Sequence, residues 1–131
     1  MKKALTVLAA LALVFAVATH AHSQDHHIKA SLEPVDNSGV SGFVQLTQLP
    51  HGGANLMVNA SGLKPGTVYA SFYYESAACD GPHDLFGTFT ANPAGKGQIQ
   101  GKIDDDLDEV GSVSVRLGPG YGTLLACAKV H

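Results

Sequence analysis

The stretch VSGFVQLTQLPHGGANLMVNA, residues 40–60, holds two short runs in which apolar and polar residues alternate. Alternation with a period of two residues is typical of a β-strand with one buried face. Between the two runs lies Pro50-His51-Gly52-Gly53, and segments rich in Gly and Pro reverse the direction of the chain. The stretch therefore predicts two antiparallel strands joined by a turn, in which His51 is a turn residue.

The same alternation continues over most of the chain. Fifteen glycines and six prolines separate the alternating segments, and none of these segments has the period of an amphipathic helix. We expect strands at residues 28–32, 40–46, 56–60, 68–74, 86–91, 97–103, 112–117 and 124–130. The pattern predicts one all-β domain of seven or eight antiparallel strands, a β-sandwich or flattened barrel.

The first residues of the chain predict export. Met1-Lys2-Lys3 is a short basic start, and residues 4–18 form an apolar run. A basic start before an apolar run of about 15 residues is typical of a secretory signal peptide, whereas a transmembrane helix needs roughly 20 apolar residues. Small residues allow cleavage after Ala18, Ala21 or Ser23, and we favour Ala21.

This cleavage site divides the chain into a signal peptide at 1–21, a polar arm at 22–27 and a β domain at 28–131. The mature protein is then expected in the periplasm or outside the cell, with a retained N-terminal anchor as the alternative. Loss of the two signal-peptide lysines leaves 6 basic residues against 11 acidic ones. Such a surface argues against nucleic acid and anionic membranes as partners.

The chain contains two cysteines, Cys79 and Cys127. In an exported protein a single pair is most simply interpreted as one disulfide. The closed loop of about 49 residues would contribute roughly 4 kcal/mol to stability in the chain-entropy treatment. A Cys-x-x-Cys motif is absent from the sequence, which argues against a thiol-exchange enzyme.

The polar arm carries three histidines, His22, His26 and His27. Imidazole is a common ligand of Cu, Ni and Zn, so the arm is predicted to bind copper or zinc weakly; the alternative is a solvated arm without a role. An amino terminus at Gln24 would add its amine and two amides to His26, and one at His22 would add its amine to the ring. His131 joins such a site only if the fold brings it to the arm.

Residues 104–109 place five carboxylates in six positions. Calcium prefers clustered carboxylate oxygens, so a surface calcium site is one interpretation. The glycine-containing loop spacing of the common calcium motif is missing, and runs of like charge are usually solvated. We therefore expect a solvated loop that contributes to solubility or steers a partner.

Five segments resemble the copper/zinc superoxide dismutase family, in the family's order. They read Gly-Val-Ser-Gly-Phe-Val at 39–44, Ser-Gly-Leu-Lys-Pro-Gly at 61–66, Cys-Asp-Gly-Pro-His at 79–83, Phe-Gly-Thr-Phe-Thr-Ala at 86–91 and Leu-Ala-Cys at 125–127. The paired cysteines and the Gly-Pro-His motif are the most specific part. The resemblance implies an eight-stranded Greek-key sandwich, or flattened barrel, with the two cysteines bridged. A lesser likeness is to extracellular chordin-type β domains.

The resemblance also implies that most metal ligands are missing. The family's copper-binding His-x-His pair falls on Ser71 and Tyr73, and the histidine of its penultimate strand falls on Leu117 or Arg116. Only the histidine that bridges copper and zinc has a match, in His83, and the segment after it is too short for the family's zinc loop. Since dismutation needs a redox-active metal held by several imidazoles, we predict no dismutase activity. His83 is a candidate remnant metal ligand; the alternative is a turn residue whose ring is hydrogen-bonded to the backbone.

The strand expected at 68–74 offers a second kind of site. Tyr69, Ser71 and Tyr73 lie on the face opposite its apolar residues, and Tyr side chains are common in binding surfaces because they join an apolar ring to a polar tip. This face is a candidate surface for a protein partner, or else ordinary packing under a loop. The favoured function is metal handling, with a metal-free interaction module or a residual dismutase with rearranged ligands as alternatives.

Overall fold

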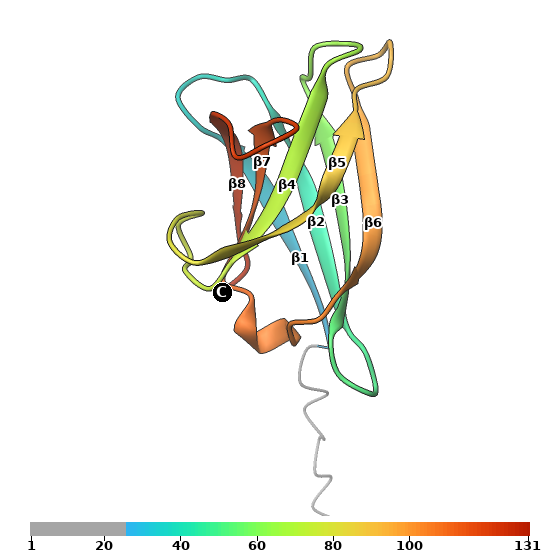
Figure 1. Cartoon of the computed structure of the whole chain (residues 1–131), viewed down its shortest axis with the longest axis vertical. Helices are drawn as coiled ribbons and strands as arrows, with labels where there is room; N and C mark the ends of the chain where they lie inside the picture. Colours follow the sequence, from blue (N-terminus) through green and yellow to red (C-terminus); the bar gives the residue numbers. More distant parts are fainter. Residues whose placement is uncertain (1–25) are drawn as a thin grey trace, which may run out of the picture.

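The computed structural model describes residues 26–131, which form eight β-strands and one short 3-10 helix (Figure 1). The predicted signal peptide at 1–21 and His22 lie outside the described residues. The elements are β1 (His27–Pro34), β2 (Ser41–Gln48), β3 (Ala54–Ser61), β4 (Val68–Tyr74), β5 (His83–Thr90), β6 (Gly97–Ile103), η1 (Leu107–Glu109), β7 (Ser112–Leu117) and β8 (Leu124–Lys129). All strand pairs are antiparallel, so the predicted all-β class is confirmed.

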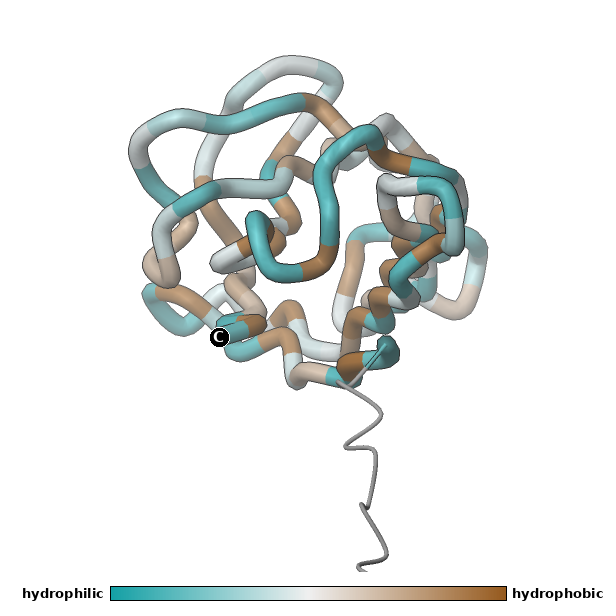
Figure 2. Tube along the Cα trace, turned by 90° about the horizontal axis from the view of Figure 1, so that it is seen from below, coloured by the Kyte–Doolittle hydropathy of each residue, from teal (hydrophilic) through white to brown (hydrophobic). Residues whose placement is uncertain are grey.

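The strands form a single sheet that rolls into a nearly closed barrel. Their order across the sheet is β5-β4-β7-β8-β1-β2-β3-β6, and its two end strands, β5 and β6, lie side by side (Figure 1). Seen from below, the strands are arranged in a ring (Figure 2). The connection from β6 to β7 contains η1 and crosses the lower end of the barrel in Figure 1, near the last residue of the chain.

Side chains, rather than a backbone ladder, close the described barrel between β5 and β6. Glycines on each strand make room for apolar side chains of the other. A Cβ atom on Gly87 would lie 2.5 Å from Cδ1 of Ile99, and one on Gly97 would lie 2.5 Å from the ring of Phe89. The side chains of Ile99 and Phe89 therefore fill the space between the two strands. Packing of an aromatic ring over a glycine of a neighbouring strand is a known way to stabilise a sheet.

The alternating residues of the opening stretch lie at the centre of the core. Val44 and Leu46 of β2 lie directly opposite Val58 and Leu56 of β3, and all four side chains are fully buried. Burial of an aliphatic side chain contributes about 1.5–3 kcal/mol, so this cross-strand cluster fixes which face of each strand points inward. The predicted pair of strands is confirmed, and His51 lies in the turn between them.

A smaller apolar cluster lies on the outer face of β4. Ala70, Phe72 and Tyr74 pack there with Cys79, which forms the predicted disulfide with Cys127 of β8, with an S–S distance of 2.02 Å. The bridge connects the segment between β4 and β5 to a strand two positions away in the sheet. As a result, β4 is buried on both of its faces.

Candidate functional site

β4 places the predicted tyrosine face inside the barrel. Tyr69, Ser71 and Tyr73 are 4%, 0% and 8% exposed, so the prediction of an interaction surface at these three residues is wrong. The physical reason is that β4 is covered on both sides, by the core on one and by the disulfide loop on the other. Because both faces of β4 are buried, the alternation in its sequence separates the two faces but does not identify the one that points into the barrel.

The two positions that the resemblance assigns to copper are consequently interior positions. Ser71 Oγ is buried and has no hydrogen-bond partner among the described residues. Burial, together with the nearby carboxylates of Asp84, Asp105 and Asp104, raises the pKa of Tyr73 to about 12. A buried hydroxyl and a neutral phenol do not replace imidazole ligands for copper.

His83 begins β5 on the outer face, where aromatic side chains surround its ring. Tyr121 stacks on it with ring centroids 4.2 Å apart, and the rings of Phe72 and Tyr74 lie at 5.5 and 5.8 Å. His83 Nδ1 lies 2.8 Å from the carbonyl oxygen of Gly81; because a carbonyl only accepts, Nδ1 carries the hydrogen and Nε2 the lone pair. Within residues 26–131, His83 belongs to no group of three close metal-ligating side chains.

Arg116 of β7 lies beside this aromatic cluster, and the sequence analysis assigned it no role of its own. Its buried guanidinium donates to the hydroxyls of Tyr74 and Tyr121 at 2.9 and 2.8 Å. It also donates to the carbonyl oxygens of Cys79 and Gly122 at 3.1 and 2.9 Å. The arginine thus fastens the disulfide loop and the loop after β7 to the sheet.

These residues do not fit the copper and zinc that the superoxide dismutase resemblance implies. On the outer face of β4, β5 and β7, one imidazole, His83, stands among aromatic rings and next to the guanidinium of Arg116. A fixed positive charge repels a metal cation, and one imidazole is too few for tight copper binding.

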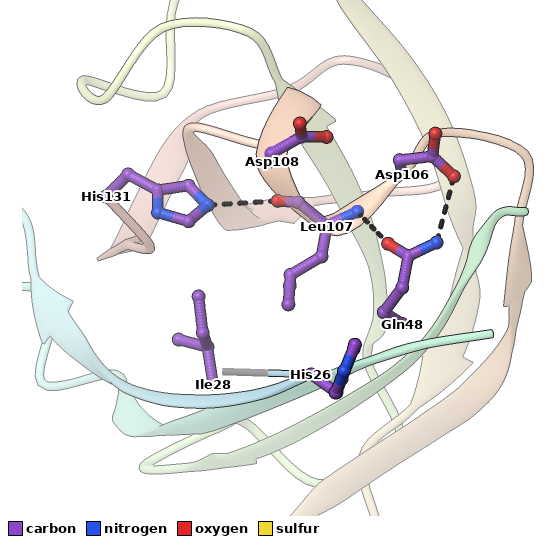
Figure 3. Close-up of a pocket in the computed structure, with 7 residues that line it drawn as sticks. All are labelled: His26, Ile28, Gln48, Asp106, Leu107, Asp108 and His131. Atoms are coloured by element: carbon purple, nitrogen blue, oxygen red, sulfur yellow. Dashed lines mark hydrogen bonds between the residues drawn. The ribbon is translucent and has the colours of Figure 1, made fainter. Parts of the chain in front are cut away.

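A different group of residues meets at the lower end of the barrel, where a pocket of about 430 Å³ lies beside η1 (Figure 3). Its lining comes from four separated parts of the sequence: the start of β1, the end of β2, the region of η1, and the last residue of the chain, two positions after β8. The residues are His26, Ile28, Gln48, Asp106, Leu107, Asp108 and His131. The fold therefore brings His131 to the same pocket as His26 of the arm.

His131 is held in a defined orientation in this pocket. Its Nε2 lies 2.9 Å from the carbonyl oxygen of Leu107 (Figure 3), and because that oxygen can only accept, Nε2 carries the hydrogen. Nδ1 therefore keeps its lone pair. The preceding residue is anchored as well, since the N–H of Val130 donates to the carbonyl oxygen of Gly111 at 2.9 Å.

Gln48 joins the parts of the pocket through both its backbone and its side chain. Its N–H donates to the carbonyl oxygen of His26 at 2.6 Å. Its Oε1 accepts from the N–H of Leu107 at 2.7 Å, and its Nε2 donates to Asp106 Oδ1 at 3.0 Å (Figure 3). One glutamine at the end of β2 thus positions both the start of the described chain and η1.

The acidic run 104–109 forms η1 and its surroundings. Leu107 is 6% exposed, so the expectation of a fully solvated loop is wrong at this position. In the described part of the chain, Asp106, Asp108 and Glu109 are the one group of three metal-ligating side chains whose ligand atoms lie within 4.8 Å of one another. A calcium site at these residues stays the alternative interpretation of the run.

Two of these three carboxylates already serve the local structure. Asp106 Oδ1 accepts from Gln48 and from the N–H of Gly53, and these hydrogen bonds lower the pKa of Asp106. Glu109 Oε1 accepts from the N–H of Asp106 at 3.1 Å. Asp108 is exposed and lines the pocket, so its carboxylate is the one that remains for a ligand.

Among the described residues, the other predicted metal ligands, His27 and His83, are not brought to this pocket. His27 Nδ1 lies 2.9 Å from Thr47 Oγ1 of the neighbouring strand, and its side chain is not part of the pocket lining. His83 belongs to the outer-face cluster, and His22 lies outside the described residues.

No known protein family model and no curated protein sequence matches the chain when its sequence is compared with them. Among the residues described by the structure, no helix has the length and apolar character needed to cross a bilayer. The site therefore has to be interpreted from its own geometry.

Proposed function

We propose that this protein is an exported β domain of superoxide dismutase-like, Greek-key fold that binds a copper or zinc ion through histidines near its N-terminus and has no dismutase activity. Its role would be the handling of metal ions. The observation that carries this proposal is the pocket at the barrel end, in which His26 of the arm lies with a second histidine and two aspartates.

The strand pairing supports the Greek-key part of the proposal. β6 pairs with β3 and β7 pairs with β4, so neighbours in the sheet are not neighbours in the chain. The disulfide between the segment after β4 and β8 agrees with the bridge that the resemblance implies. It is also compatible with export, since disulfides persist in oxidising compartments.

The first test is superoxide decay in the presence of the mature protein loaded with copper. We expect no acceleration beyond a control with the same amount of free copper, because the outer face offers one imidazole beside a buried cation. A rate near diffusion control that survives a chelator would contradict the proposal and favour a dismutase with rearranged ligands.

The second test is metal binding itself. The mature protein, freed of metal by dialysis against a chelator, is titrated with Zn²⁺ and Cu²⁺ beside a variant in which His22, His26 and His27 are all alanine. We expect about one ion per chain for the wild type and marked loss of affinity in the variant. Absence of binding by the wild type would overturn the proposed function.

A metal-free interaction module remains the second candidate, at a different place from the predicted one. Tyr121 and Leu85 are 46% and 55% exposed, and Tyr121 packs on His83 and Phe72 at the outer face of the sheet. An exposed tyrosine and leucine over a rigid sheet fit a protein-binding surface. Failure of the metal titration would favour this candidate.

A further inference from the structure

We propose that the ion is held at the barrel end by His26, Asp108 and His131, and that His27 and His83 are not ligands. This inference rests on the proposed metal-binding function and specifies its site. The ligand is a divalent ion of borderline softness such as Zn²⁺, since two imidazoles and one carboxylate, completed by water, are a common ligand set for that ion.

His131 is the member of the set that the fold prepares best. Metal-ligating histidines usually donate their second ring N–H to a carbonyl or carboxylate, which fixes the tautomer and the ring orientation. The 2.9 Å contact between His131 Nε2 and the carbonyl oxygen of Leu107 supplies this arrangement. Nδ1 of His131 is therefore the ring nitrogen available to bind an ion, and the hydrogen bond from Nε2 orients the ring before the ion binds.

Asp108 is placed by the same helical turn that orients His131. It follows Leu107, whose N–H donates to Gln48 and whose carbonyl oxygen receives the His131 hydrogen bond. The two neighbouring carboxylates, on Asp106 and Glu109, are engaged in hydrogen bonds to backbone N–H groups. Asp108 is thus the carboxylate of η1 that can bind an ion without loss of helical capping contacts.

His26 completes the set from the opposite wall of the pocket. Its carbonyl oxygen is fixed by the N–H of Gln48, and its side chain is exposed. Without an ion, the ligand atoms of His26, Asp108 and His131 do not all lie within 4.8 Å of one another, so binding requires the His26 side chain to turn about its two dihedral angles toward the ion. Ile28 and Leu107 provide apolar lining between the two histidines (Figure 3). All three proposed ligands are exposed, so water has access to the site and can complete the coordination of the ion.

The charges around the pocket also favour a cation. Two carboxylates and no lysine or arginine are among the described residues that line it, and further acidic side chains precede η1 in the run 104–109. This contrasts with the outer face around His83, where Arg116 lies within the same cluster. A cluster of negatively charged carboxylates raises the local concentration of cations.

The experiment is a Zn²⁺ titration of the mature protein against a competing fluorescent chelator, repeated for single variants. We expect His26→Ala and His131→Gln to lower the affinity at least about tenfold, because each removes one direct ligand. Asp108→Asn is expected to act in the same direction. His27→Ala and His83→Ala are the matched controls, and their affinities should stay within about twofold of the wild type.

His131→Gln is chosen because its amide can still donate to the carbonyl oxygen of Leu107 while it removes the imidazole. Urea unfolding of each metal-free variant shows whether the barrel is intact. The absorption spectrum of bound Co²⁺ gives a second readout, since loss of a nitrogen ligand changes its d–d bands.

The outcomes separate this inference from the proposed function. If the wild type binds but the His131 and Asp108 variants bind equally well, the site is wrong and the metal-binding function stands. If affinity is lost with His27 or His83 instead, the site is also wrong. If the wild type binds no ion, the proposed function fails and this site fails with it.

Discussion

At the scale of single residues, Arg116 shows how a buried positive charge is accommodated beside the outer face of β4. A buried guanidinium without a carboxylate partner is costly unless its N–H groups are hydrogen-bonded, and Arg116 donates four hydrogen bonds to neutral oxygens. Planar, fixed donors suit this task better than a lysine ammonium would. The position is therefore specialised for holding loops together and not for ligating an ion.

Tyr73 allows a prediction about pH. Its pKa is 10.0 in an unperturbed tyrosine and about 12 in the folded protein, chiefly because of burial. Below pH 10 the phenol is protonated in both states. Between pH 10 and about 12 the unfolded chain loses this proton while the folded protein keeps it, so the free energy of unfolding decreases over this window.

The Tyr73→Phe variant should lose stability less steeply at alkaline pH than the wild type. Urea unfolding at about pH 9 and about pH 11.5 measures this difference, and the absorbance of tyrosinate should show one fewer group ionising near the upper end of the window. An equal decrease for both proteins would mean that Tyr73 is not protonated preferentially in the fold.

Single residues were also where the sequence was least informative. The period of β4 was visible, but Tyr69 and Tyr73 were assigned to the outer face and lie in the core. Period alone cannot choose a face when both are buried. Likewise, no local pattern could show that His131 and His26 line the same pocket, because that depends on where β8 ends and β1 begins in the barrel.

At the scale of elements, the strands and turns were predicted well, because their signals are local. Alternation and Gly- or Pro-containing turns located all eight strands, with one difference: the acidic run contains η1 with a buried leucine. That short turn has its own capping contacts between Asp106 and Glu109 and is also anchored from outside, by Gln48 of β2. Contacts between distant elements of this kind leave no periodic signal in the sequence.

The meeting of β5 and β6 leads to a prediction for the barrel closure. Gly97→Ala places a Cβ atom 2.5 Å from the ring of Phe89 and 3.1 Å from Leu63 Cδ1, and both of these side chains are buried in the core. Overpacking of this kind costs about 1–3 kcal/mol. We expect the free energy of unfolding in urea to decrease by that amount.

Gly101→Ala is the matched control on the same strand. Its added Cβ would lie 3.5 Å from the ring of Phe86, which is an ordinary contact. The control should therefore be neutral within about 0.5 kcal/mol or slightly stabilising, because alanine restricts the unfolded chain more than glycine does. Equal effects of the two substitutions would show that β5 and β6 are not closely interlocked at Gly97.

At the scale of the whole molecule, the disulfide is the one covalent link between strands that are distant in the sequence. Cys79 and Cys127 are separated by 48 positions, so the bridge restricts nearly half of the described chain when it unfolds. The chain-entropy treatment assigns roughly 4 kcal/mol to a loop of this length. Since small domains are stable by about 5–15 kcal/mol in total, this contribution is a large fraction.

The double variant Cys79→Ala/Cys127→Ala should therefore lose about 4 kcal/mol of unfolding free energy, measured by urea titration of the metal-free protein. Its m-value should increase, because an unfolded chain without the bridge exposes more surface. Packing lost at the buried Cys79 would lower stability but leave the m-value unchanged, so the m-value distinguishes the two causes. A loss below about 1 kcal/mol with an unchanged m-value would mean that the bridge does not appreciably restrict the unfolded chain.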